Sequence, residues 1–256
     1  MSDPIYAIGD IHGQRAWLEE LLERVDRDGG PGARLVLLGD LVDRGPDSRG
    51  VIDLLIAEAA AGRNMTVLAG NHDVMFRRFL ADATVHDANI KSGLPWPHRR
   101  LGGLATLQSY GVDVDERRPM EEIHADTLAA VPEAHAAFLA GLPYWLESGD
   151  KLFVHAGIVP GVALQDQRID DLIWIRDAFY EAAQDLPWLV VHGHTALEAP
   201  RHFGPRIDLD SGAGYGRMPT AARLEGHAAW VLEADGPRPL PVEPEEPEET
   251  GTADQG

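Results

Sequence analysis

The sequence has no cysteine and almost no lysine. Of its 22 basic residues only Lys91 and Lys151 are lysines, and 42 acidic residues bring the formal net charge of the 256 residues to −20. Without cysteine there is no disulfide framework, no thiolate nucleophile and no cysteine-ligated metal site. Any metal must therefore be held by His, Asp, Glu, Asn or water. So acidic a chain does not suit a general binder of nucleic-acid backbones, which neutralises phosphates with clustered basic residues.

Long hydrophobic runs are missing as well. No stretch approaches the roughly 18 apolar residues of a transmembrane helix, and no basic segment precedes an apolar one at the start of the chain. We therefore expect a cytoplasmic protein with no membrane partner. The length suits one sizeable domain, which we place at residues 1–235. Residues 236–256 contain five prolines and end in an acidic stretch, so we expect a disordered acidic tail there.

Short apolar runs alternate with helical patterns in the first eighty residues. The apolar runs are 5–8, 35–38 and 65–69, and segments 17–25 and 51–56 between them carry apolar side chains at helical spacing. Strand and helix alternating in this way predict βαβ units and a parallel sheet that is covered on both faces. The fold class that we expect is α/β with α+β character.

The strand pattern stops between about residues 79 and 143. Helical patterns broken by prolines in this segment predict a helical cap inserted into the sheet domain. Strand-like runs resume at 144–146, 152–154, 188–191, 207–209, 220–224 and 228–232. The later runs lie close together with glycine-rich turns between them, so we expect them to pair antiparallel.

Five of the apolar runs end in a polar cluster. The clusters read Gly9-Asp10-Ile11-His12-Gly13, Gly39-Asp40-Leu41-Val42-Asp43-Arg44-Gly45, Gly70-Asn71-His72-Asp73, His155-Ala156-Gly157 and His192-Gly193-His194-Thr195. Ligands of open α/β sheets bind outside the carboxyl ends of the strands, so the five clusters are expected to converge on one rim.

The clusters contain the side chains that a hard or borderline metal ion prefers. The candidate ligands are the carboxylates of Asp10 and Asp40, the imidazoles of His12, His155 and His194, and the amide oxygen of Asn71. This set suits Mn, Fe or Zn. Turn geometry and helix capping would account for Gly, Asp and Asn in such loops, but not for histidines at three corresponding strand ends.

In this order and spacing the five clusters resemble the PPP family of metal-dependent phosphoprotein phosphatases, within the calcineurin-like metallophosphoesterases. The likeness is to the compact bacterial and phage branch, and it covers about residues 5–80 and 151–232. It implies a β-sandwich of mixed sheets flanked by helices. It also implies two divalent cations, with Mn²⁺ first and Fe or Zn as alternatives. Asp10, His12 and the bridging Asp40 would hold the first cation, and Asn71, His155 and His194 would complete the second.

The resemblance also implies a reaction. A hydroxide that bridges the two cations attacks phosphorus directly, His72 oriented by Asp43 is the general acid, and Arg44 and Arg176 hold the phosphate oxygens. The implied activity is a hydrolase of phosphoric ester bonds, namely a serine/threonine phosphoprotein phosphatase acting on phosphorylated proteins or small phosphoesters. The sequence leaves the roles of two further side chains open. His192 could share the face of His194, and Tyr215 is either an aromatic of the site or a turn residue.

Two other functions compete with this interpretation. Symmetrical diadenosine tetraphosphate hydrolases have nearly the same motifs. Their second motif is Gly-Asp-Leu-Val-Ala-Arg-Gly, with alanine in place of the acid that corresponds to Asp43. The retention of Asp43 here favours phosphomonoesters. A non-catalytic scaffold on the same fold predicts loss of ligands or of the acid histidine, and none of them is missing.

Overall fold

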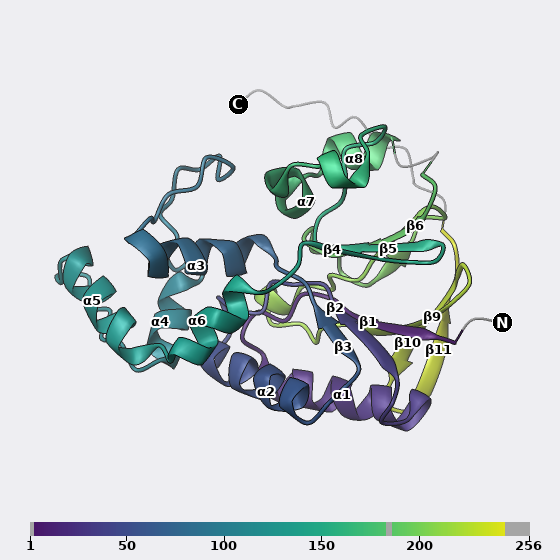
Figure 1. Cartoon of the computed structure of the whole chain (residues 1–256), viewed down its shortest axis with the longest axis horizontal. Coiled ribbons are helices and arrows are strands. Elements are labelled where there is room, and N and C mark those ends of the chain that lie inside the picture. Colours follow the sequence, from purple (N-terminus) through teal and green to yellow (C-terminus); the bar gives the residue numbers. More distant parts are fainter. Residues whose placement is uncertain (1–2, 183–185, 244–256) are drawn as a thin grey trace, which may run out of the picture.

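Two packed sheets form the centre of the computed structural model, which describes residues 3–182 and 186–243 (Figure 1). The larger sheet has six strands in the order β11-β10-β9-β1-β2-β3. Their bounds are Gly236–Leu240, Ala228–Glu233, Ala221–Glu225, Ile5–Ile8, Arg34–Leu37 and Met65–Val67. β1, β2 and β3 pair in parallel and β9 to β11 add antiparallel strands, so the predicted mixture of the two pairings is confirmed.

The smaller sheet has five strands in the order β4-β5-β6-β8-β7. Their bounds are Trp145–Ser148, Lys151–Val154, Leu189–His192, Arg206–Asp208 and Arg201–His202. β5, β6 and β8 pair in parallel, whereas β4 and β7 are antiparallel edge strands. The carboxyl ends of β5 and β6 therefore open toward the same side, as those of β1, β2 and β3 do in the larger sheet.

Side chains of β1 alternate between two hydrophobic cores. Ile5 and Ala7 join Phe153, Val191 and other residues of the smaller sheet in a core between the two sheets. Tyr6 and Ile8 belong to the core beneath the helices. All four residues of β1 are buried because both faces of the sheet are covered, which is the reason that the run reads as continuously apolar.

Helices cover the outer faces. Helices α1 (Arg15–Gly29) and α2 (Ser48–Ala60) lie along the larger sheet, and α7 (Ile169–Trp174) and α8 (Asp177–Ala182) lie beside the smaller one (Figure 1). The α1 residues Leu18, Leu21, Leu22 and Val25 recur at helical spacing and are buried. No helix in the two described ranges is long and apolar enough to cross a membrane.

The cap, residues 83–143, extends to one end of the molecule (Figure 1). It follows α3 (Asn71–Asp82) and contains α4 (Gly103–Ser109), α5 (Met120–Ala130) and α6 (Glu133–Ala140). The expected helical insertion is confirmed, although the structure places its first residues, 79–82, in α3.

The tail expected at 236–256 is wrong at its start. Residues Gly236–Leu240 form β11, which pairs with β10 at the edge of the larger sheet. Proline is tolerated on an edge strand, where an absent N–H faces solvent, so the prolines at 237 and 239 do not prevent pairing. Residues 244–256 of the expected tail lie outside the described residues.

Candidate metal centre

Loops that follow five strands bring the predicted ligands together. Asp10 and His12 follow β1, Asp40 follows β2, and the other three are Asn71 at the start of α3 after β3, His155 after β5 and His194 after β6. All six side chains are buried. We call these five loops the rim. The approach between them is close: a Cβ on Gly70 would lie 2.1 Å from Oδ1 of Asp40, so only glycine fits at that position.

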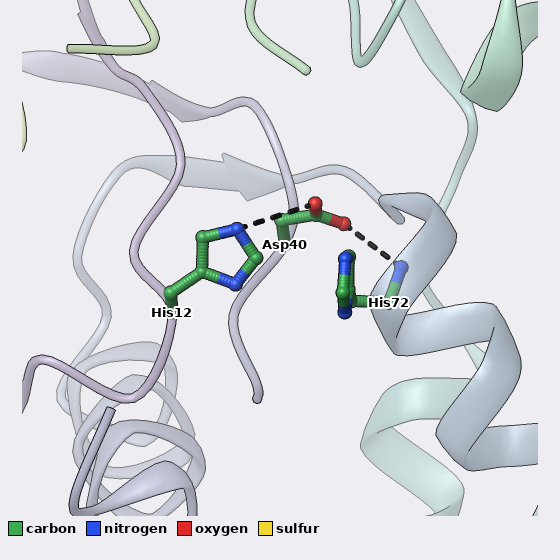
Figure 2. Close-up of side chains that lie close together, drawn as sticks. All are labelled: His12, Asp40 and His72. Atoms are coloured by element: carbon green, nitrogen blue, oxygen red, sulfur yellow. Dashed lines mark hydrogen bonds and ion pairs between the residues drawn. The ribbon is translucent and has the colours of Figure 1, made fainter. Parts of the chain in front are cut away.

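Asp40 lies at the centre of the group. His12 Nε2 is 3.6 Å from Asp40 Oδ2, and His155 Nε2 is 3.5 Å from Asp40 Oδ1. The backbone N–H of His72, in the first turn of α3, donates to Asp40 Oδ1 over 2.9 Å (Figure 2). Ligand atoms of Asp10, Asp40 and His155 lie within 4.8 Å of one another, and so do those of His12, Asp40 and His72. One carboxylate thus belongs to both groups of potential ligands.

Asn71, His155 and His194 form the second half of the centre. The amide oxygen of Asn71 lies 3.0 Å from His155 Nε2 and 3.0 Å from His194 Nδ1. The backbone N–H of His194 donates to Asp10 Oδ1 over 3.2 Å, which connects this half to the β1 loop. The structure therefore brings all six predicted ligands into one continuous buried cluster.

The imidazoles of His12 and His155 are in the tautomer that can bind a cation. His12 Nδ1 and His155 Nδ1 each lie 2.9 Å from a backbone carbonyl, of Val42 and Leu38 respectively. A carbonyl only accepts, so these nitrogens carry the proton and each Nε2 presents a lone pair. Burial lowers the pKa of both rings, which keeps them neutral. The lone pair of His155 faces oxygens of Asn71 and Asp40, a set of acceptors that a cation would satisfy, and the lone pair of His12 faces Asp40 and the Arg44 guanidinium.

The pKa values of Asp40 and Asp10 are shifted in opposite directions. Burial would raise the pKa of Asp40, but the positive charge that neighbouring imidazoles such as His155 take up at acidic pH lowers it below its usual range. Burial and the nearby carboxylates of Asp210 and Asp40 raise the pKa of Asp10 well above its usual range. Asp40 is the residue best suited to hold a full negative charge at the centre of the cluster.

His72 lies beside the ligand cluster with its own partners. Its Nδ1 is 2.6 Å from Asp43 Oδ2, so the buried carboxylate accepts a hydrogen bond from the ring. The predicted pair of His72 and Asp43 is thus in direct contact. The guanidinium of Arg44 forms hydrogen bonds with two imidazoles. Its Nη1 lies 2.7 Å from His12 Nε2, and its Nη2 lies 3.0 Å from His72 Nε2.

A cavity of about 380 Å³ opens beside His194. Arg44 and Arg176, the two predicted phosphate-binding residues, both line it, together with Tyr215 and Arg217. Arg176 Nη1 donates to Thr195 Oγ1 over 3.1 Å. The ring of Tyr215 is 67% exposed, and the Arg44 guanidinium lies 5.4 Å from its centroid, so Tyr215 is an aromatic of the cavity mouth. Arg217 was not predicted from the sequence.

Asp210 is a further site residue that the sequence analysis missed. It is buried, lines the same cavity, and raises the pKa of Asp10. It follows β8, which neighbours β6, so the polar end of a sixth strand was the signal that could have found it. His192, by contrast, faces away from the cluster of ligands: its ring packs against Phe179 and Tyr180 and lies 3.8 Å from Asp208.

Comparison with curated proteins finds dinucleoside tetraphosphatases. The chain is 26% identical to the asymmetrical bis(5'-nucleosyl)-tetraphosphatase PrpE of Bacillus subtilis, over 85% of this chain and 89% of that protein. It is 32% identical to the symmetrical bis(5'-nucleosyl)-tetraphosphatase of Paracidovorax citrulli, over 71% of this chain and 50% of that protein. These relatives favour the alternative of the sequence analysis over its main interpretation, and the serine/threonine phosphatase branch is not confirmed.

Solved structures share the fold. A structure described as a putative diadenosine tetraphosphatase superposes with a TM-score of 0.63 at 24% identity, covering 93% of this chain and 95% of that one. The cold-active protein-tyrosine phosphatase of a Shewanella species gives a TM-score of 0.59 at 16% identity, covering 94% and 83%. The family model for calcineurin-like phosphoesterases matches residues 3–227. With the rim described above, this match shows that the chain is a member of the calcineurin-like phosphoesterase family, a metallophosphoesterase that hydrolyses phosphoester bonds.

Proposed function

We propose that the protein hydrolyses dinucleoside polyphosphates, and that it cleaves diadenosine tetraphosphate asymmetrically. The observation that carries the proposal is the third arginine of the cavity. Arg44 and Arg176 suffice to hold the oxygens of one phosphoryl group, since each guanidinium offers a fork of donors. Arg217 adds a further positive charge where a chain of phosphates would extend beyond the reacting one.

Arg217 is held in place by the backbone. Its Nε donates to the carbonyl of Ser211 over 2.6 Å and its Nη2 to the carbonyl of Leu197 over 2.9 Å. Its guanidinium lies 5.9 Å from the centroid of Tyr215, whose other neighbour is Arg44. The exposed ring of Tyr215 offers a face on which a nucleobase can stack. Two arginines beside an exposed aromatic side chain suit a nucleotide better than a phosphorylated side chain.

The relatives support the same substrate class. Asymmetrical tetraphosphatases align over most of this chain and of their own, as in the Bacillus subtilis and Anoxybacillus flavithermus proteins at 89% and 88% of their lengths. The symmetrical enzymes align over half of their length or less. We therefore expect one nucleotide product with one phosphate and one with three.

Members of the family use a pair of divalent cations. We propose Mn²⁺, held by Asp10, His12 and Asp40 on one side and by Asp40, Asn71, His155 and His194 on the other. When bound, such a pair activates water and stabilises negative charge on the reacting phosphoryl group.

The residues of the chain supply orientation and a proton. Arg44 and Arg176 hold the nonbridging oxygens of the reacting phosphoryl group. His72, whose Nδ1–H donates to Asp43, acts as the acid when its ring also carries a proton on Nε2, which it gives to the departing oxygen as the P–O bond breaks. A nucleotide leaves with little need of that proton, whereas an alkoxide or phenoxide needs it most. The His72 and Asp43 pair therefore also favours a second candidate activity, the hydrolysis of phosphomonoesters.

The test compares two substrates in the Mn²⁺-loaded full-length protein. We expect diadenosine tetraphosphate to be cleaved with a higher kcat/KM than p-nitrophenyl phosphate. Arg217→Gln should raise KM for the dinucleotide about tenfold, as loss of a charged hydrogen bond does, and change p-nitrophenyl phosphate turnover by less than about twofold. Arg168→Gln is the control, because Arg168 is an exposed arginine of another surface. An equal loss on both substrates, or no turnover of the dinucleotide, would overturn the proposal.

A further inference from the structure

Two side chains of the cap meet a carboxylate of the rim. Asp43 is completely buried, and three side chains donate to it. His72 Nδ1 and Trp96 Nε1 lie 2.6 and 2.7 Å from Oδ2, and Thr106 Oγ1 lies 2.6 Å from Oδ1. The same hydroxyl of Thr106 accepts a bond from the backbone N–H of Asp43 over 2.9 Å. Trp96 and Thr106 both belong to the cap, far from Asp43 in sequence.

Trp96 is itself fixed against the helix that carries His72. Its ring is 1% exposed and stacks on Phe76 with centroids 5.5 Å apart, and it packs against Phe79 at 5.0 Å. Both phenylalanines belong to α3, whose first turn holds Asn71 and His72. The indole of Trp96 therefore links the side of α3 to Asp43, the carboxylate that contacts His72 in the first turn of α3.

Thr106 fixes the other oxygen of the carboxylate. It lies in α4, is fully buried, and its hydroxyl also lies 3.1 Å from the Ser48 hydroxyl at the start of α2. Donors on both oxygens prevent the carboxylate from rotating about its terminal bond. Both cap donors are neutral, so they stabilise the negative charge of Asp43 without competing for it as a cation would.

We propose that Trp96 and Thr106 are positioning residues, which hold the Asp43 carboxylate so that the His72 ring presents Nε2 to the leaving group. The cap thereby sets the orientation of the general acid. This inference rests on the proposed role of His72 as acid, and it does not depend on the identity of the substrate.

Substitutions can remove each donor, with the volume of the side chain nearly kept for Thr106→Val and reduced by one ring for Trp96→Phe. Trp96→Phe removes the indole N–H, and Thr106→Val removes the hydroxyl. Two matched controls exist. Trp188 donates its indole N–H to Glu147 over 2.9 Å at the surface, and the buried Thr127 of α5 donates to the carbonyl of Ile123 over 2.7 Å. Trp188→Phe and Thr127→Val lose comparable bonds away from Asp43.

The kinetic readout is the difference between two leaving groups. We expect Trp96→Phe and Thr106→Val each to lower kcat on phenyl phosphate about tenfold, which is a fraction of what loss of a general acid costs. On the activated p-nitrophenyl phosphate, each variant should lower kcat less than about twofold. KM should stay unchanged, and Thr106→Ser should restore most of the loss. His72→Asn is measured alongside and should show the largest difference between the two esters.

A second readout needs neither metal nor turnover. The chain has six tryptophans, so the indole N–H resonances are few, and Trp96→Phe identifies its own. In the metal-free protein, Asp43→Asn should move the Trp96 resonance upfield and leave that of Trp188 in place.

The outcomes separate the two proposals. If His72→Asn discriminates between the esters while Trp96→Phe and Thr106→Val lower both equally, the positioning role is overturned and the acid role stands. If His72→Asn does not discriminate, both roles fail. An unmoved Trp96 resonance in Asp43→Asn would show that the indole does not donate to this carboxylate, and would overturn its part of the proposal.

Discussion

The rim and the cap hold their functional side chains in different ways. The described ranges contain six non-glycine residues with positive φ, and five of them belong to the rim: His12, Asp40, Asp43, Arg44 and His194, with φ between 47° and 73°. The sixth, Ala83, ends α3 at the start of the cap. Such conformations each cost of order 1–3 kcal/mol and persist only where the surroundings impose them.

The loops of the rim hold one another in these conformations through hydrogen bonds. The carbonyl of Asp40 accepts from the backbone N–H of His12 over 2.7 Å, and the carboxylate of Asp73 accepts from Leu41 and Gly70 over 2.9 Å each. The cap instead acts through the regular helix α4 and two side-chain donors. The rim therefore fixes its ligands through a strained backbone, whereas the cap donates side-chain hydrogen bonds to Asp43, whose partner His72 lies beside the ligands.

Asp40→Asn should have the largest effect, because it removes the charge shared by both halves of the centre. Loss of groups that merely support a ligand costs about 10- to 100-fold in metal affinity or activity, so we expect a decrease of at least about 100-fold in both. Calorimetric titration with Mn²⁺ and kcat measure it. Asp53→Asn is the control, since Asp53 contacts His135 of the cap and Arg49 of its own helix and none of the predicted ligands. Equal loss in the two variants would contradict the central place of Asp40.

Gly45→Ala tests the strain of the rim. A Cβ at Gly45 would lie 2.0 Å from the carbonyl oxygen of His12, so the two loops must separate. We expect a loss of about 1–3 kcal/mol in the free energy of unfolding by urea, the usual cost of overpacking. Gly32→Ala, where a Cβ meets nothing within 4 Å, should change stability by less than about 0.5 kcal/mol. Full stability of Gly45→Ala would show that the rim is compliant.

A buried histidine behind the rim, His192 at the end of β6, predicts a dependence of stability on pH. Burial and the nearby Arg206 lower the pKa of His192 to about 3. In the unfolded chain its pKa is about 6.5, so below that pH the unfolded state binds a proton that the folded state does not, and stability falls as pH falls. Between pH 7.5 and 5.5 this histidine alone removes about 1.4 kcal/mol. Urea denaturation of metal-free His192→Gln should therefore show a shallower decrease, and an identical slope would exclude His192 as a contributor.

The smallest effect is expected in the cap. The hydroxyl of Tyr110 lies 2.9 Å from His135 Nδ1, and the Nε2–H of that ring donates to Asp53. Tyr110→Phe should cost about 1 kcal/mol in the free energy of unfolding, the net value of one hydrogen bond. The kcat should stay at its wild-type value, because this contact does not touch Asp43. A fall in kcat would mean that the whole cap, and not only its two donors, tunes the rim.

The sequence predicted the strand ends well because each ligand directly follows a buried apolar run. The loops after β1, β2, β3, β5 and β6 were identified in this way, and the structure brings their side chains together. Asp210 was missed because the run before it was treated only as a strand. β11 was missed because its prolines resemble those of a disordered segment.

The contacts of the cap could not be predicted from local pattern. Trp96 lies between two prolines, and Thr106 lies on a short helix, and nothing in their neighbourhood signals that Asp43 is their partner. Their role depends on how α4 packs beside the second loop of the rim, which is a tertiary property. The same holds for Arg217, whose position is set by carbonyls of residues 197 and 211.

The most direct test of the account is a competition between substrates at one site. Mn²⁺-loaded wild-type protein is given diadenosine tetraphosphate and a phosphoserine peptide together, and nucleotide products and inorganic phosphate are followed over time. We predict preferential cleavage of the dinucleotide into AMP and ATP, abolished by Asp40→Asn. Release of phosphate from the peptide with the dinucleotide untouched would contradict it and return the assignment to a phosphoprotein phosphatase.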